Sequence, residues 1–290
     1  MSSPVRLGDG RHLDVQVGGA DEGLPLVFHH GTPGAATPFR ALERAARERS
    51  LRLVTTSRPG YGSSSRHPGR SVVDVADDIA SVLANMGIER CLVAGWSGGG
   101  PHALACAARL EAAAAVLVIA GLAPHRSQGL DWMAEMGRGN VTEFNTALQG
   151  EEALRPYLDE QRTYLEGASV RAVVSSLRTV LPEADRAVVG GEFGEDLAAG
   201  MQEGLREGVD GWLDDDLAFT KPCGFSLEEI SIPTMLWHGS ADLMVPVNHG
   251  QWLSSRLACA SLHVEPDEGH LSLASRNFGR MLDELVMAGL

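Results

Sequence analysis

The chain has 290 residues, 44% of them hydrophobic, which is enough for one large α/β domain with a sizeable core. Its formal net charge of −14 argues against nucleic acid or an anionic membrane surface as a partner. Four scattered cysteines lack metal-site spacing, the N-terminus lacks a signal-peptide core, and no apolar run reaches membrane-spanning length. We therefore expect a cytoplasmic protein that uses neither a metal nor a cofactor.

The first part of the chain alternates between strands and helices. Alternating segments at 5–7 and 13–18 flank Asp9-Gly10 and predict an antiparallel hairpin at a sheet edge. Apolar strands follow at 24–28, 51–55, 91–94 and 113–120, with helical patterns at 37–49, 72–86 and 101–110 between them. This order predicts a mostly parallel sheet with helices on both faces.

The pattern changes after residue 124. From 125 to 227 the β-branched runs vanish, and helical patterns take over at 142–148, 151–166, 170–181 and 196–209. Strand patterns return at 233–237 and 261–264, with helices at 246–257 and at the C-terminus. We therefore expect a core of residues 1–124 and 228–290, interrupted by a helical lid over 125–227.

A serine stands at the sharp turn between the strand at 91–94 and the following helix, in Gly95-Trp96-Ser97-Gly98-Gly99. So tight a turn holds Ser97 in a sparsely populated backbone conformation. Strand and helix crowd each other on either side of it, which explains glycine at positions 95 and 99. Gly-x-Ser-x-Gly in this context predicts a nucleophile elbow, with the hydroxyl presented at a helix N-terminus.

A serine nucleophile needs a histidine to take its proton and an acid to orient that histidine. His270 lies in the turn after the last predicted strand, and Asp242 lies in the loop after the preceding strand. In a parallel sheet both loops open on the edge that carries the elbow, where ligands bind. The order Ser97, Asp242, His270 therefore predicts a catalytic triad.

Three other carboxylates compete for the role of the acid. Asp267 and Glu268 are close to the histidine in sequence, and Asp131 follows the strand before the predicted lid. We prefer Asp242 because the preceding Gly239-Ser240-Ala241 permits the bend that turns a carboxylate toward the cleft.

The oxyanion of the reaction needs fixed donors. We expect the backbone N–H of Gly98 to be one and that of Thr32 to be the other, with the Thr32 hydroxyl as an additional candidate. The bond before Pro33 is a candidate for the cis form. We expect His29 and His30 to satisfy loop carbonyls, and we assign no metal site because no suitable partner residues are spaced around them.

Together these motifs resemble those of the α/β-hydrolase superfamily. The resemblance rests on segments 30–34 (HGTPG), 57–64 (SRPGYGSS), 95–99 (GWSGG), 238–242 (HGSAD) and 269–270 (GH). It implies an eight-stranded, mostly parallel α/β sheet with a lid after the sixth strand, and Ser97, Asp242 and His270 as the triad. Serine at the elbow disfavours epoxide hydrolases and haloalkane dehalogenases. Prolyl iminopeptidases are similar, but they usually carry glycine where this chain has Thr32.

The function that we expect is hydrolysis of a carboxylic ester or lactone, on a small-molecule acyl substrate, by a monomer or homodimer. An aminopeptidase or amidase, or a carbon–carbon bond hydrolase, is the alternative, and a non-catalytic binding protein is a more distant one. Acidic lid residues could bind a substrate ammonium group, although we favour a solvated helix face for them: Glu151, Glu152 and Asp214-Asp215-Asp216. Apolar lid residues could line the substrate pocket: Trp132, Met133, Met136, Phe144 and Trp212.

Overall fold

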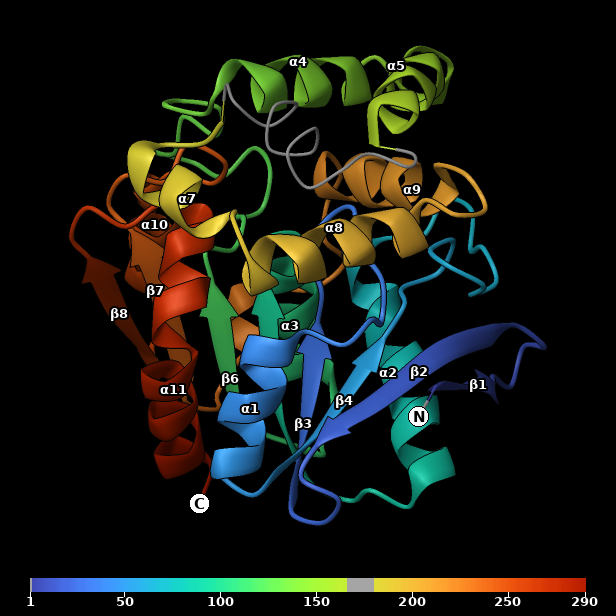
Figure 1. Cartoon of the computed structure of the whole chain (residues 1–290), viewed down its shortest axis with the longest axis vertical. Coiled ribbons are helices and arrows are strands. Elements are labelled where there is room, and N and C mark those ends of the chain that lie inside the picture. The colour runs from blue at the N-terminus through green and yellow to red at the C-terminus, as the bar shows by residue number, and fades with distance from the viewer. Residues whose placement is uncertain (1, 166–179) are drawn as a thin grey trace.

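Eight strands form one sheet in the order β1-β2-β4-β3-β5-β6-β7-β8, in a computed structural model that describes residues 2–165 and 180–290 (Figure 1). The strands are β1 (Ser2–Arg6), β2 (His12–Gly19), β3 (Leu24–His29), β4 (Leu51–Thr56), β5 (Cys91–Trp96), β6 (Ala113–Ile119), β7 (Thr234–Gly239) and β8 (Ala260–Glu265). β2 runs antiparallel to both β1 and β4, and all other neighbours are parallel. The predicted edge hairpin and parallel sheet are both confirmed.

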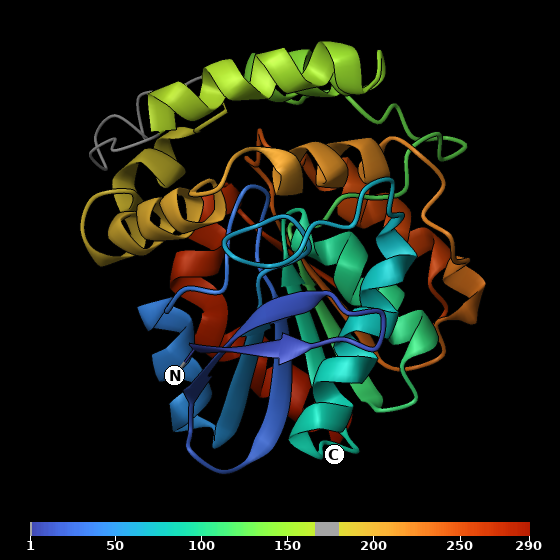
Figure 2. The same ribbon diagram turned by 90° about the vertical axis from the view of Figure 1, so that its right-hand side faces the viewer.

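Helices cover both faces of the sheet (Figures 1 and 2). One face carries α1 (Arg40–Glu48) and α11 (His270–Gly289), and the other carries α2 (Val75–Met86), α3 (Gly99–Arg109) and α10 (Val247–Arg256). Successive side chains of β3 enter opposite cores: Leu26 and Phe28 pack on the first face, and Val27 packs on the second. Burial on both faces explains why the central strands are apolar throughout.

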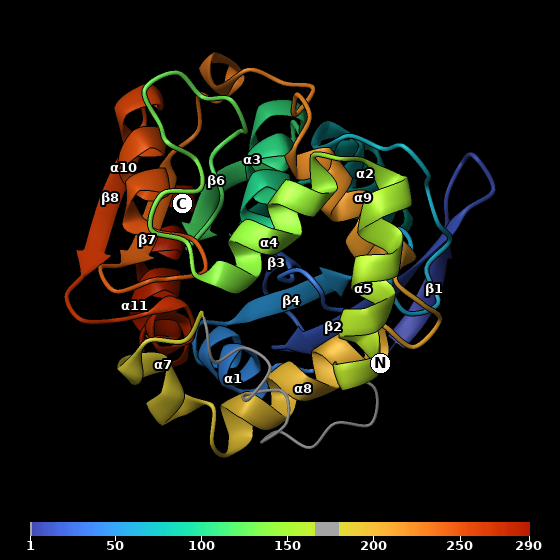
Figure 3. The same ribbon diagram turned by 90° about the horizontal axis from the view of Figure 1, so that it is seen from above.

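Several helices between β6 and β7 lie beyond the carboxyl ends of the strands (Figures 1 and 3). They include α4 (Arg138–Ala147), α5 (Glu151–Leu165), α7 (Glu183–Val188), α8 (Glu192–Gly204) and α9 (Asp210–Phe219). The predicted helix at 170–181 falls almost entirely outside the described residues. That this β6–β7 segment is a separate lid over 125–227 stays a prediction.

Several boundaries differ from those that the sequence predicted, among them two beside Ser97 and His270. His270, expected in a turn, is the first residue of α11, and Gly269 caps that helix. The helix predicted from residue 101 begins at Gly99, so it follows the elbow serine almost directly. In residues 2–165 and 180–290, no helix combines the length and the hydropathy needed to cross a membrane.

Candidate active site

Ser97 lies between the end of β5 and the start of α3 and has a left-handed backbone, with φ of +56°. A Cβ on Gly95 would collide with the carbonyl of Gly99, and one on Gly99 would collide with that of His29. The Ser97 N–H donates to the carbonyl of Ile119 on β6 at 2.9 Å. The strained serine is therefore held by close backbone packing that only glycine permits on either side.

Asp242 and His270 form a buried hydrogen-bonded pair. His270 Nδ1 lies 2.7 Å from Asp242 Oδ2, and the other carboxylate oxygen, Oδ1, accepts the backbone N–H groups of Met244 at 2.8 Å and Val245 at 2.9 Å. The carboxylate needs the Nδ1 proton for this bond, which leaves Nε2 of His270 as the free base. Burial lowers the pKa of His270, but the charge and hydrogen bond of Asp242 outweigh it, so the pKa is raised.

A second buried carboxylate fixes the backbone of the histidine. Asp185 of α7 accepts the N–H groups of His270 at 2.9 Å, Leu271 at 3.0 Å and Ser272 at 2.8 Å. These are free donors at the N-terminus of α11, where a negative charge is also favoured by the helix dipole. A side chain from the β6–β7 segment therefore holds the start of the helix that carries the histidine.

The other three carboxylates weighed for the acid do not bond to the histidine. Asp131 and Asp267 are exposed, and Glu268 pairs with Arg276 at 2.8 Å. Of the four candidates, the structure therefore brings only Asp242 into hydrogen-bond contact with His270.

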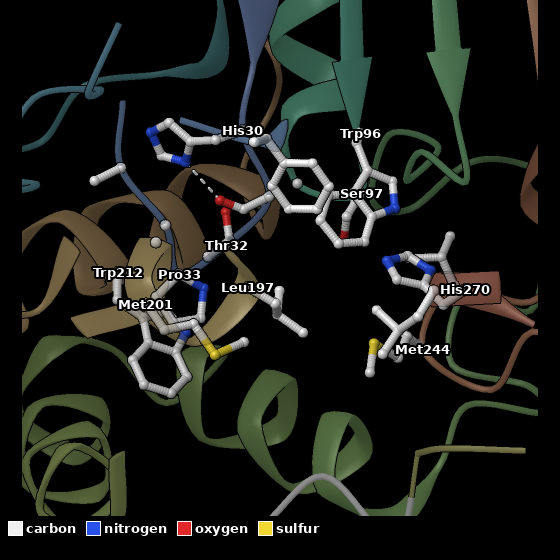
Figure 4. A pocket seen from close by; sticks show the side chains of 18 of the residues that line it. His30, Thr32, Pro33, Trp96, Ser97, Leu197, Met201, Trp212, Met244 and His270 are labelled. Atoms are coloured by element: carbon white, nitrogen blue, oxygen red, sulfur yellow. Dashed lines mark hydrogen bonds between the residues drawn. The ribbon is translucent and has the colours of Figure 1, made fainter. Parts of the chain in front are cut away.

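Ser97 and His270 face one cavity, together with Thr32 and Gly98 of the predicted oxyanion hole (Figure 4). The cavity has a volume of about 190 Å³. The Thr32–Pro33 peptide bond is cis. Among the described residues, the backbone N–H groups of Thr32 and Gly98 have no hydrogen-bond acceptor, so both donors are available to a ligand. The geometry brings all five predicted site residues to one region of the sheet edge.

A buried ionic cluster lies against the loop of residues 30–34, which follows β3. Asp215 of α9 forms ion pairs at 2.7 Å with both Arg58 and Arg70, and it accepts the hydroxyls of Thr32 at 2.7 Å and Tyr61 at 2.9 Å. The hydroxyl proton of Thr32 is therefore committed to a carboxylate and is not free for a ligand. Arg58 also donates to the carbonyls of residues 30 and 31, which fastens the loop by its backbone.

The histidines near this loop have structural contacts. His30 Nδ1 lies 2.7 Å from the Gly31 carbonyl, and its Nε2 accepts the N–H of Arg58 at 3.3 Å. His102 Nδ1 lies 2.8 Å from the Gly98 carbonyl, and burial together with the charge of Arg58 lowers its pKa to about 3. Burial also holds the pKa of His30 well below its usual value, and both imidazoles bond to the backbone.

The expectation that residues 214–216 lie on a solvated helix face is wrong, because all three are buried. Asp214 pairs with Arg66 at 2.8 Å, and Asp215 belongs to the cluster described above. Asp216 instead lines the cavity that Ser97 and His270 face, beside Glu143 of α4. Consecutive helical residues point in different directions, so one run of acids meets three environments.

The predicted apolar lining is right only in part. Phe144 and Trp212 line the cavity, whereas Trp132 packs its ring 5.4 Å from that of His249 and donates to the carbonyl of Ala123. Its neighbours Met133 and Met136 belong to the same hydrophobic core and do not line the cavity.

Four residues near Ser97 and His270 have contacts that the sequence did not predict: Asp185, Arg58, Glu143 and Asp215. Only Arg58 had a sequence signal, because it stands in a loop rich in turn formers directly after a strand. Asp185, Glu143 and Asp215 lie on helices, and an acidic residue on a helix is usually interpreted as exposed.

Comparisons with known proteins agree with this architecture. The family model for the alpha/beta hydrolase fold matches residues 25–276. A pimeloyl-[acyl-carrier protein] methyl ester esterase from Nitrosomonas europaea is 25% identical over 91% of this chain and 94% of its own. A proline iminopeptidase from Xanthomonas citri is 27% identical over 97% of this chain and 93% of its own. A thermophilic esterase structure from Thermogutta terrifontis covers 100% of both chains with a TM-score of 0.73 at 19% identity.

Proposed function

The chain belongs to the alpha/beta hydrolase family, and from this premise we propose that it is a serine hydrolase of carboxylic esters or lactones. The observation that carries the proposal is the 2.7 Å bond from His270 to Asp242. The same His270 lines one cavity with Ser97, which is held in a strained turn. A histidine oriented by a buried acid is what a serine needs to become a nucleophile.

In the proposed reaction Ser97 Oγ attacks the acyl carbon while Nε2 of His270 takes the hydroxyl proton. The carbonyl oxygen becomes an oxyanion, and the N–H groups of Thr32 and Gly98 donate to it. The tetrahedral intermediate collapses, its carbon–oxygen bond to the leaving alcohol breaks, and His270 returns the proton to that alcohol. In a lactone the alcohol stays attached to the acyl group.

Water then completes the cycle. His270 takes a proton from a water molecule, which attacks the acyl-enzyme, and the carboxylic acid leaves as Ser97 recovers its proton. Asp242 keeps its charge throughout and stabilises the imidazolium that forms in each half-reaction.

The decisive experiment is labelling with a fluorophosphonate, read by intact mass. We expect wild type to gain one adduct, and Ser97→Ala and His270→Ala to gain none. Ser255→Ala removes an exposed serine on α10 that bonds to the Trp252 carbonyl, and it should label like wild type. A folded wild type that does not label, or a Ser97→Ala variant that does, would refute the proposal.

An amide is the second candidate substrate, because a proline iminopeptidase is among the relatives that match almost the whole chain. The same mechanism cleaves amides when the leaving amine takes the proton. A panel of esters, lactones and aminoacyl anilides, measured as kcat/KM with wild type and Ser97→Ala, separates the two classes. Higher kcat/KM for proline anilide than for every ester would replace the ester proposal.

A further inference from the structure

Two carboxyl side chains face each other in the wall of the active-site cavity. Glu143 comes from α4 and Asp216 from α9, and their carboxyl groups share a hydrogen bond. Glu143 also accepts the indole N–H of Trp212 at 2.8 Å. Trp212 lies across the cavity from Ser97 and His270 (Figure 4), so the pair belongs to the end away from the nucleophile.

This pair differs from three other acidic groups of the β6–β7 segment. Asp214 and Asp215 pair with arginines, as does Glu151 with Arg155 at 2.9 Å. Within residues 2–165 and 180–290, no ion pair joins Glu143 or Asp216 to an arginine, lysine or histidine. Asp216 is only 1% exposed, and its Oδ2 is buried and accepts no N–H or hydroxyl hydrogen bond. An acceptor of this kind inside a ligand cavity is unsatisfied until a donor arrives.

Burial and neighbouring charges change the pKa of both carboxyl groups in the pair. Burial raises the pKa of Asp216 well above its usual value, and the neighbouring Glu143 and Asp215 raise it further. Burial also raises the pKa of Glu143, although Trp212 acts in the opposite direction. Among the described residues, Tyr157 is a further titratable side chain near the pair, and it carries no positive charge. Both raised pKa values favour one proton shared by the pair over two carboxylate charges in contact.

We propose that Glu143 and Asp216 together bind a protonated amine on the substrate. The ammonium group replaces the shared proton, which leaves for solvent, and it donates to the free Oδ2 of Asp216 and to Glu143. The inference rests on the proposed function, because it assigns the substrate class of that same cavity: an ester or lactone whose acyl group carries a primary or secondary ammonium. The cation offsets two buried negative charges that are otherwise unfavourable.

Matched ester pairs test the proposal, because a methyl group has nearly the shape of an ammonium group. One pair is the p-nitrophenyl esters of 6-aminohexanoate and heptanoate, and the other is those of 2-aminobutanoate and 2-methylbutanoate. For at least one pair we expect wild type to prefer the ammonium ester by about 10-fold or more in kcat/KM, the range of a charge-assisted hydrogen bond. Glu143→Gln and Asp216→Asn should each reduce that preference by about 10-fold.

A matched control and a pH series sharpen the test. Glu152→Gln removes an exposed carboxylate at the start of α5 and should leave the preference unchanged. Because the pair must lose its proton to bind the cation, KM for the 6-aminohexanoate ester should fall as pH rises through the raised pKa of the pair. KM for the heptanoate ester should not follow that course.

Measurements of equilibrium binding distinguish a failure of this inference from a failure of the proposed function. Butylammonium chloride should bind wild type and Ser97→Ala in calorimetric titrations, and should bind Glu143→Gln about 10-fold more weakly. Hydrolysis of the neutral esters with neither ammonium preference nor butylammonium binding would overturn the inference and leave the hydrolase standing. Butylammonium binding without any ester hydrolysis would refute the hydrolase and retain the cation site.

Discussion

Asp215→Asn should be among the most damaging nearly isosteric changes in the protein. The side chains of Asp215 and Arg58 have no exposed surface, and that of Arg70 is 3% exposed. The amide fills the same space, so no cavity forms, but two buried guanidinium groups lose their counter-charge. Removing one partner of a buried ion pair costs about 3–5 kcal/mol, because the remaining charge is left uncompensated.

The assay is thermal and urea unfolding of wild type and variant. A loss of about 3–5 kcal/mol corresponds to a fall in melting temperature of about 5–8 °C for a chain of this size. Asp215 also holds Thr32, whose N–H belongs to the proposed oxyanion hole. We therefore expect ester kcat, measured well below the melting temperature, to fall by about 10-fold or more, since small displacements of catalytic groups are costly.

Asp214→Asn is the matched control on the same helix. Its partner Arg66 is 26% exposed and keeps Asp210 at 3.3 Å and Glu151 at 3.8 Å, so about 1 kcal/mol or less should be lost.

Burial opposes ionisation of Asp215, but Arg58 and Arg70 outweigh it and lower its pKa well below the usual value. The stability that charged Asp215 gives the fold is therefore complete above the ordinary pKa of a carboxyl group. It is lost only as pH falls through the lowered pKa of Asp215. Equal losses in the two variants at neutral pH would refute the reasoning.

Three further predictions concern the elbow, the triad and the cysteines. Gly99→Ala places a Cβ against the His29 carbonyl and should lower stability by about 1–3 kcal/mol or more in urea unfolding. Asp242→Asn removes the charge that raises the pKa of His270, so the acidic limb of the pH–rate profile should move to lower pH. The same variant should lower kcat by about 100-fold or more. An acidic limb that does not move would contradict this prediction. Iodoacetamide should modify only Cys259 in the native protein, because it is exposed and burial raises the pKa of the other three thiols.

The sequence by itself determined the sheet and the order of the proposed catalytic groups. Runs of apolar residues marked the strands, and their alternation with helical patterns required parallel pairing with helices on both faces. Glycine on either side of Ser97 marked the elbow because only a missing Cβ permits that packing. The edge of the sheet at which Asp242 and His270 lie followed from topology, since carboxyl ends of parallel strands share one edge.

Only the tertiary structure decided what surrounds those groups. The three acids at 214–216 have the same charge and adjoining positions, yet helical neighbours point about 100° apart. Asp214 therefore pairs with Arg66, and Asp215 pairs with two buried arginines. Asp216 contacts Glu143, a residue 73 positions earlier in the chain. Such pairings depend on how helices of the β6–β7 segment pack on the sheet, and no periodicity or local motif in the sequence encodes them.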